Sequence, residues 1–413
     1  MTASGIEIRY ALSVGRLLTV EEAQERVLAS VRARAPETVL LERAAGRVTA
    51  VAACAAVDLP PFPSSAMDGY AVRAADVPGT LPVVGHVAAG SPAERPLAPG
   101  EAMGVATGGV VPQGADAVVP VEYVVIHDNE TIEVAEALAA GAHVRPRGGD
   151  VAAGVVVVEA GVRLGAVQLG ALGAAGAAEV ECGPRPRVAV LATGSELARP
   201  GWPLEPGQVY EANGLMLATS LAAAGAVVER LPVVADDESA HREALERGLR
   251  ADVLVTSGGV SVGPHDLVRR IEAELGVEEV FWQVAVKPGK PVAFGVCGET
   301  LVFGLPGNPV SSLVGCELFV KPALRALQGE RDPLPRFERG RLAAPLRRNP
   351  ARDELVRARL RPGPDGVLLE PLPGQESHMI VRAAAADALV HVPRGDGELA
   401  AGALAAWLRL DAC

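Results

Sequence analysis

From Pro186 onward, runs typical of buried strands alternate with segments typical of helices. RVAVLATG, ADVLVTSGG and LVFGLPG are short apolar runs that end in glycine, whereas NGLMLATSLAAAG, DESAHREALERGLR and HDLVRRIEAELG are typical of helices. This alternation predicts a mostly parallel, doubly wound sheet with helices on both faces. Because ligands of such sheets bind outside the carboxyl ends of the strands, we expect the chemistry at that edge.

The segments around this α/β region have different patterns. Short β-like runs separated by Pro/Gly turns between residues 58 and 147 predict a small all-β module. Thr19 and Glu22 have the spacing of a capping box, which predicts a helix to about Ala33. Proline and arginine are frequent from 330 to 350, as in a linker, and β-like runs follow. We therefore predict four parts: a mixed α/β domain (7–57 with 148–184), an inserted β domain (58–147), an α/β domain (185–329) and a C-terminal β-barrel-like domain (330–413).

Composition excludes several classes of protein. The chain has 38 basic and 50 acidic side chains, a formal net charge of −12, and no concentrated Lys/Arg run, so we do not expect nucleic-acid binding. No apolar run is long enough to span a bilayer, and the N-terminal residues do not resemble a signal peptide. The five scattered cysteines have no metal-binding spacing and suit a reducing compartment. We expect a cytoplasmic protein without membrane contact.

Two strand-to-helix corners carry glycines. In DVLVTSGGVSVGPHD, Ser257, Gly258 and Gly259 follow a strand, and Ser261 and Asp266 precede or begin the next helix. Bare backbone N–H groups, hydroxyls and a helix start favour an anion, although an ordinary tight turn has the same residues. GLPGNPVSS places Asn308 before a proline at the expected first helical position, which fits either a ligand corner or a helix cap.

Lysines and carboxylates lie near further turns. Lys287 and Lys290 flank a Pro-Gly turn, where they favour a dianion or simply form a solvated hairpin. Because several corners meet at one sheet edge, a phosphate-bearing ligand is the better interpretation. Asp68 follows a proline-stiffened stem, and Gly69 is expected to free the backbone after it. Each carboxylate alone fits a helix cap or a solvated turn, but together they favour a hard cation; they are Asp68, Asp150, Glu196 and Asp236.

Six ordered motifs identify the chain as similar to a known family. PSSAMDGYAV, RPRGGDV, LATGSEL, TSGGVSVGPHD, VKPGKPVAFG and GLPGNPVSS resemble the MoeA-type molybdopterin molybdenumtransferases, which are related to the E domain of gephyrin. The resemblance covers nearly the whole chain. It implies an inserted β domain, an α/β molybdopterin-binding domain and a C-terminal β domain, in agreement with the patterns above.

The resemblance also implies an activity. Enzymes of this family insert molybdate-derived molybdenum into adenylylated molybdopterin and release AMP with the help of Mg²⁺. By motif, Asp68, Glu196 and Asp266 are expected as active-site carboxylates, with Asp150 and Asp236 as further metal ligands. Residues expected around the substrate or the oxyanion are Thr107, Ser257, Gly258, Gly259, Ser261, Lys287, Lys290, Pro291, Asn308, Arg352 and Ser377.

Partners and rival functions follow from the same resemblance. The family forms homodimers in which the β module of one subunit covers the α/β domain of the other, so Asp68 is expected to face the partner's site. Transient contacts with other enzymes of molybdenum-cofactor synthesis are also expected. Pro63-Ser64, Ser195 and Pro264-His265 replace more acidic residues of many relatives and reduce the charge near the expected metal. The alternatives are a molybdopterin adenylyltransferase and a gephyrin-like scaffold without turnover.

Overall fold

The structure, a computed structural model, describes residues 17–127, 130–235, 237–259, 267–363 and 365–410. The chain forms two compact units: Thr38–Glu181 is one, and the residues up to Glu37 together with those from Cys182 onward are the other. We call the latter the first unit and Thr38–Glu181 the second unit. Among the described residues, no helix has both the length and the apolar character to cross a bilayer. The four domains predicted from the sequence divide the chain more finely than these two units, and their boundaries stay a prediction.

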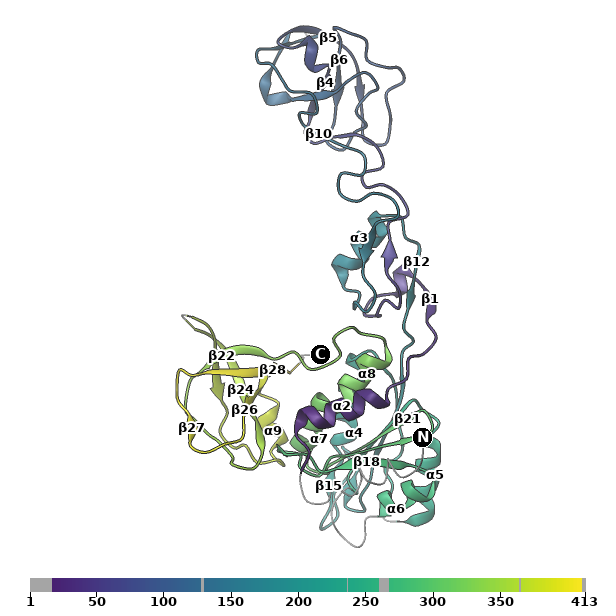
Figure 1. The fold of residues 1–413 in the computed structure, drawn as a ribbon, viewed down its shortest axis with the longest axis vertical. Coiled ribbons are helices and arrows are strands. Elements are labelled where there is room, and N and C mark those ends of the chain that lie inside the picture. The colour runs from purple at the N-terminus through teal and green to yellow at the C-terminus, as the bar shows by residue number, and fades with distance from the viewer. Residues whose placement is uncertain (1–16, 128–129, 236, 260–266, 364, 411–413) are drawn as a thin grey trace, which may run out of the picture. The chain divides into compact units, whose positions relative to one another are not determined.

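A mixed six-stranded sheet organises the first unit (Figure 1). Its order is β16-β13-β17-β21-β20-β18, in which the first four strands run parallel and the last two are antiparallel to their neighbours. The prediction of a mostly parallel sheet is therefore confirmed. The strands are β13 (Arg187–Ala192), β16 (Val227–Arg230), β17 (Val253–Ser257), β18 (Glu278–Trp282), β20 (Ala293–Cys297) and β21 (Thr300–Leu305).

Helices cover both faces of this sheet because its residues alternate between two cores. Val188 and Val190 of β13 pack with the core of α2, α4, α7 and α8, whereas Ala189 and Leu191 pack with α5 and α6. Figure 1 shows α5 and α6 away from the other helices. The helices are α2 (Val20–Ser30), α4 (Asn213–Ala223), α5 (Glu238–Gly248), α6 (Leu267–Glu274), α7 (Pro309–Gly315), the π-helical turn η4 (Cys316–Val320) and α8 (Lys321–Leu327).

Helix α2 begins with the predicted capping box but packs in the first unit. Glu22 donates its backbone N–H to the Thr19 hydroxyl at 3.1 Å, and the Glu22 carboxylate accepts from the Thr19 backbone N–H at 2.8 Å. The buried face of α2 lies in the same core as η4 and α8. The prediction from the sequence assigns this helix to a domain together with residues 148–184. The structure places it in the first unit instead, because the apolar stripe of α2 packs against the closing helices of the sheet.

The C-terminal part is a closed five-stranded barrel, as predicted. Its order is β24-β25-β22-β28-β26, and β26 pairs back with β24. Trp407 lies fully buried in its core. The predicted linker 330–350 is wrong in its second half, since β22 begins at Glu338. The elements are β22 (Glu338–Leu342), β23 (Leu346–Arg347), β24 (Asp353–Gly363), β25 (Gly366–Pro371), α9 (Ile380–Ala383), β26 (Ala388–Val392), β27 (Glu398–Leu399) and β28 (Leu404–Arg409).

The second unit contains the predicted β module, a six-stranded sheet of order β7-β4-β6-β5-β9-β8. These strands are β4 (Gly69–Val72), β5 (Gly79–Val87), β6 (Ala102–Val105), β7 (Ala117–Pro120), β8 (Val124–His127) and β9 (Thr131–Val134). The rest of the unit has short strand pairs and one helix: β1 (Glu37–Leu40) with β12 (Glu179–Cys182), β2 (Ala53–Cys54) with β11 (Val156–Val158), β3 (Ser64–Ser65) with β10 (Val144–Arg145), and α3 (Ala166–Ala174).

A buried ion pair in the closing helices allows a stability prediction. The Lys321 ammonium lies 2.6 Å from the Glu317 carboxylate, and the two side chains are 4% and 5% exposed. Lys321→Met leaves a buried carboxylate without this partner, so we expect it to lower the free energy of unfolding by about 3–5 kcal/mol. Urea unfolding followed by tryptophan fluorescence measures this, because Trp202, Trp282 and Trp407 all lie in the first unit.

The matched control removes both charges. Glu317→Met/Lys321→Met is expected to restore most of the lost stability, since an apolar pair of similar volume leaves no uncompensated charge. A single variant as stable as the wild type would contradict the prediction.

Candidate active-site cleft

Three strand ends of the first unit open into one cleft of about 790 Å³. β13, β17 and β21 are parallel neighbours, so their carboxyl ends lie at the same edge of the sheet. The loops after these strands contribute most of the lining, and the corners predicted from the sequence therefore meet. Predicted site residues in the lining are Glu196, Ser257, Gly258, Gly259, Pro291 and Asn308.

Asn213, the first residue of α4, joins two of these corners. Its amide Nδ2 donates to the Ser257 hydroxyl at 2.9 Å and to the Gly307 carbonyl at 2.7 Å. The buried Asn213 Oδ1 accepts no hydrogen bond from the residues that the structure describes. Asn213 was not among the predicted site residues, although its place at a helix start after a strand was a usable signal.

The Ser257 hydroxyl, predicted to bind an anion, is engaged within the protein. It accepts from Asn213 and lies 3.3 Å from the Ser312 hydroxyl and 3.4 Å from the Pro306 carbonyl oxygen. Ser257 itself is only 2% exposed. Its hydroxyl therefore holds the β17 and β21 corners together.

The two glycines after Ser257 are required by geometry. Gly258 and Gly259 have φ values of +99° and +66°, which side chains rarely adopt. A Cβ at Gly258 would lie 2.6 Å from the Thr193 carbonyl oxygen, and one at Gly259 would lie 2.5 Å from Val268. Gly258 donates its N–H to the Leu305 carbonyl, so this N–H supports the corner.

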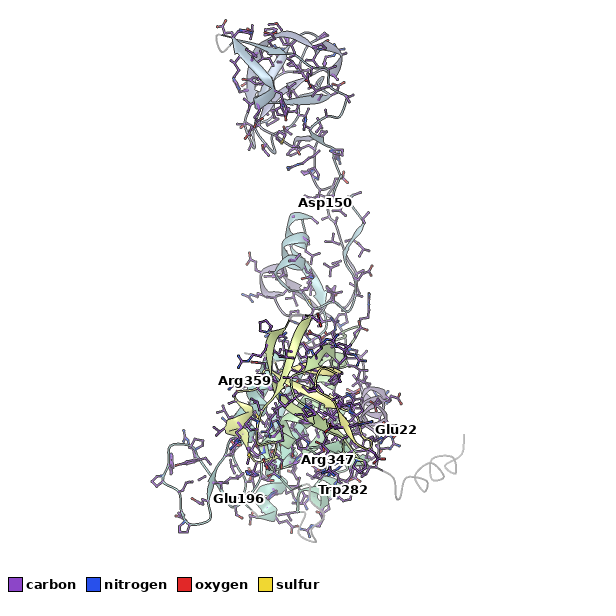
Figure 2. The ribbon with its side chains drawn as sticks, turned by 90° about the vertical axis from the view of Figure 1, so that its left-hand side faces the viewer. Glu22, Asp150, Glu196, Trp282, Arg347 and Arg359 are labelled. Atoms are coloured by element: carbon purple, nitrogen blue, oxygen red, sulfur yellow. The ribbon has the colours of Figure 1, made fainter. Side chains whose placement is uncertain are left out.

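Glu196 lies at the base of an exposed loop between β14 (Leu197–Ala198) and β15 (Val209–Tyr210) (Figure 2). The Val209 N–H donates to the Glu196 carbonyl at 2.9 Å, which closes the base of this loop. The carboxylate folds back over Gly194, where a Cβ would lie 2.4 Å from Oε2. Glu196 thus presents an exposed carboxylate at the cleft.

The two predicted lysines have different surroundings. Lys287, in β19 (Val286–Lys287), forms a 2.9 Å ion pair with Glu354 of β24, and β19 pairs with β24. Lys290 is half-buried, and its carbonyl oxygen accepts from Val284 and Val292. Neither side chain is among the residues that line the cleft, whereas the neighbouring Pro291 is.

A buried arginine of the barrel holds the loop that carries Ser377. Arg357 is 1% exposed and donates to the carbonyls of Gly374 and Met379 at 2.8 Å and to that of Glu376 at 3.2 Å. Desolvation lowers the pKa of its guanidinium below the usual value. The Ser377 carbonyl accepts from the Val310 N–H at the start of α7. The loop thereby brings His378 into the cleft lining.

Asp68 and Thr107 lie together in the second unit. Asp68 Oδ1 accepts from the Thr107 N–H at 2.7 Å and from its hydroxyl at 3.0 Å. These two bonds, the backbone one first, lower the pKa of the Asp68 carboxyl. Gly69 was expected to free the backbone. Its role is steric instead, because a Cβ there would lie 2.0 Å from the Val119 carbonyl oxygen of β7.

The remaining predicted residues lie elsewhere or outside the description. Asp150 belongs to the second unit (Figure 2), where its N–H donates to the Leu59 carbonyl. Arg352 is half-buried beside β24 and donates its N–H to the Asn349 side chain at 3.1 Å. Three predicted residues, Asp236, Ser261 and Asp266, lie outside the described residues. Within the described ranges, no three His, Cys, Asp or Glu side chains are grouped to hold a metal.

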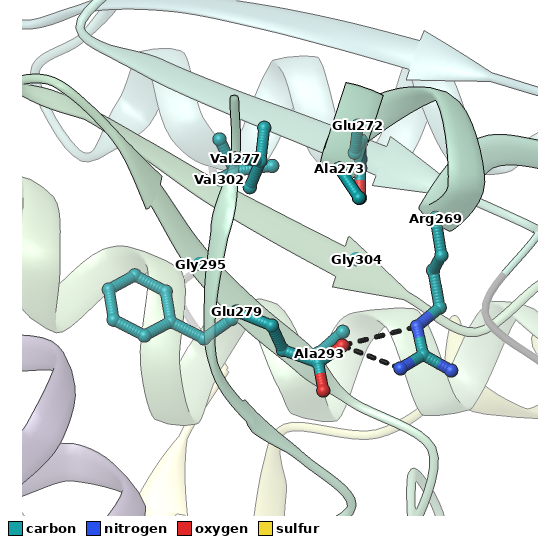
Figure 3. Close-up of a pocket in the computed structure, with 10 residues that line it drawn as sticks. Arg269, Glu272, Ala273, Val277, Glu279, Ala293, Gly295, Val302 and Gly304 are labelled. Carbon is teal, nitrogen blue, oxygen red and sulfur yellow. Dashed lines mark hydrogen bonds and ion pairs between the residues drawn. The ribbon is translucent and has the colours of Figure 1, made fainter. Parts of the chain in front are cut away.

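A second, smaller cavity of about 270 Å³ lies beside α6 (Figure 3). Its cation is already neutralised, because Arg269 donates to the Glu279 carboxylate at 2.6 and 3.2 Å. The guanidinium carbon also lies 4.6 Å from the centre of the Trp282 ring. No predicted site residue lines this cavity, so the larger cleft is the candidate active site.

Several cleft residues were missed by sequence reasoning. Tyr210 and His241 line the cleft, and His241 is 1% exposed with Nδ1 placed 2.9 Å from the Asp237 carbonyl oxygen. Glu211 is 3% exposed, pairs with Arg230 at 3.0 Å and accepts from the Gly214 N–H. Glu211 stands two residues before α4, and only the structure shows that it is buried.

Comparison with known proteins identifies the family. Three family descriptions match in order: "MoeA N-terminal region (domain I and II)" over residues 18–176, "Probable molybdopterin binding domain" over 189–326 and "MoeA C-terminal region (domain IV)" over 339–410. The chain is similar to molybdopterin molybdenumtransferase 2 of Mycobacterium tuberculosis, with 38% identity over 399 residues, 93% of this chain and 97% of that protein.

Two further similarities agree. The molybdopterin molybdenumtransferase of Haemophilus influenzae is 37% identical over 319 residues, which cover 76% of this chain and 79% of that protein. A crystal structure of the molybdopterin biosynthesis MoeA protein from Pyrococcus horikosii superposes with a TM-score of 0.80 at 31% identity, covering 96% of this chain and 100% of that one. The predicted fold class is thereby confirmed. The chain belongs to the MoeA family, the molybdopterin molybdenumtransferases of molybdenum cofactor biosynthesis.

Proposed function

We propose that the chain transfers molybdenum from molybdate to adenylylated molybdopterin and releases AMP, with Mg²⁺ assisting. One observation carries this finer assignment. The glycine corners after β17 and β21 and the carboxylate of Glu196 all line one preformed cleft. Such a cleft accommodates the phosphates of a nucleotide-linked substrate at the carboxyl edge of the sheet. A homodimer is part of the proposal, and the family resemblance is its support.

The residues of the cleft have separate roles in this proposal. The bare backbone at Gly259 and Gly307 allows the phosphates to approach the corners closely, while Asn213 keeps the corners at a fixed separation. Lys290, half-buried beside the cleft residue Pro291, supplies positive charge for the anionic substrates. Lys287 has a second role, because its ion pair with Glu354 attaches the barrel to this turn.

The residues present fit a magnesium ion. Mg²⁺ prefers one or two carboxylates together with substrate phosphates and water, and the exposed Glu196 carboxylate supplies such an oxygen donor in the cleft. When bound, the ion stabilises negative charge on the leaving phosphate. Glu196 would hold it, and the corners would orient the phosphates.

The main test measures AMP release from adenylylated molybdopterin, with molybdate and Mg²⁺ added. Glu196→Gln removes the charge but keeps the shape, so we expect the rate to fall by roughly 10²-fold and AMP release by the wild type to require Mg²⁺. Glu229→Gln is the matched control, since Glu229 lies on β16, is 53% exposed and pairs with Arg247. The control is expected to retain wild-type activity.

Two outcomes would count against the proposal. A folded wild type that releases no AMP points to a scaffold, and AMP release that does not depend on molybdate points away from metal insertion. If Glu196→Gln and Glu229→Gln are equally active, Glu196 has no role in the reaction.

The buried Arg357 provides a second prediction. Arg357→Lys loses the planar fork and leaves carbonyls of residues 374–379 without this charged donor, so the free energy of unfolding is expected to fall by about 3 kcal/mol. The loop with His378 then moves, and KM for the substrate is expected to rise. Urea titration and steady-state kinetics measure the two effects. Arg359→Lys is the control, because Arg359 lies two positions along β24 and its Nε donates to the Ala385 carbonyl at 3.2 Å. An equal effect of this variant would contradict the interpretation.

A further inference from the structure

Three side chains of the second unit surround a position that has none. Tyr70 of β4 and His86 of β5 each pair with Gly104 of β6, which lies between the two strands. Directly paired residues of neighbouring strands point to the same face. Asp68, in the bend just before β4, lines the same hollow as Tyr70 and His86. Asp68, Tyr70 and His86 thus gather around a glycine.

A hollow of about 380 Å³ lies beside Gly104, and these residues line it. A Cβ at Gly104 would lie 2.0 Å from His86 Nδ1, so the imidazole rests against the bare backbone. The backbones of the Tyr70 and His86 strands lie two strand spacings apart, roughly 9–10 Å. The imidazole leans over the strand between them, so both rings are available to pack against a flat group in the hollow.

The polar groups of the hollow select its occupant. Both bonds from Thr107 reach Asp68 Oδ1, and Oδ2 has no hydrogen-bond partner in the described part of the chain. Apolar residues, among them Val87 and Val121, form much of the remaining lining. A fixed anionic acceptor beside rings and apolar walls suits a planar N–H donor. A tetrahedral oxyanion would be repelled by the carboxylate.

We propose that this hollow binds a planar nitrogen heterocycle of the substrate. A ring N–H donates to Asp68 Oδ2, and the ring packs against Tyr70 and His86. The inference rests on the proposed function because it concerns the same substrate, which carries two such rings, a pterin and an adenine. It assigns substrate binding to Asp68 in place of the metal-ligand role expected from the sequence. The titratable side chains that line the hollow are Asp68, Tyr70 and His86, within the described residues.

The test measures ring binding without turnover, using the full-length chain, neopterin as the pterin probe and AMP as the adenine probe. Gly104→Ala displaces the His86 ring and narrows the hollow, so the affinity for the bound ring is expected to fall by about tenfold or more. Gly85→Ala is the matched control on the same strand, because a Cβ there meets no atom within 4 Å. Its affinity is expected to equal that of the wild type. The probe that loses affinity identifies the ring.

A second variant separates binding from folding. His86→Ala removes one wall without adding atoms, and we expect it to weaken the same probe by about fivefold with an unchanged melting temperature. Unchanged affinity in both variants, or a wild type that binds neither neopterin nor AMP, would overturn the inference. If the protein binds a ring probe but releases no AMP, the proposed function is refuted. The inference that the hollow binds a planar heterocycle still stands in that case.

Discussion

The two hydrogen bonds from the Asn213 amide join the loops on which the cleft depends. One reaches the hydroxyl at the end of β17, and the other reaches the Gly307 carbonyl after β21. The parallel register of β17 and β21 starts both loops at one sheet edge, and Gly307 lies near the backbone of Gly258. With Asn213 at the start of α4, a helix, two strands and two glycine corners form one preorganised wall.

The barrel supplies the second support of the cleft. β19 connects the Pro-Gly turn to β24 through backbone pairing and the Lys287–Glu354 ion pair. From the same strand, Arg357 organises the loop that reaches the start of α7 and places His378 in the lining. The buried guanidinium donates to three carbonyls of this loop at once and so fastens it to the barrel. The C-terminal part therefore helps shape the site of the α/β part.

Local signals predicted the sheet, the barrel and the glycine corners, because buried runs and turn residues act over a few positions. They did not predict features that depend on distant partners. The sequence alone suggests that Lys287 binds an anion. The structure shows that its ammonium pairs with Glu354, which is 67 residues away in the sequence. Arg357 looks like an ordinary outward charge in an alternating strand, and only the structure shows it buried. The hollow around Gly104 depends on the register of three strands that no single stretch of sequence specifies.

We propose that the cleft bounded by Glu196, Gly259 and Asn308 receives the phosphates of the substrate. The decisive measurement is a crystal structure of the full-length protein with AMP, Mg²⁺ and molybdate. We expect phosphate density against the glycine corners after β17 and β21, with a metal ion within coordination distance of Glu196. Phosphate bound elsewhere, for example in the small cavity beside α6, with the cleft filled by water, would contradict it.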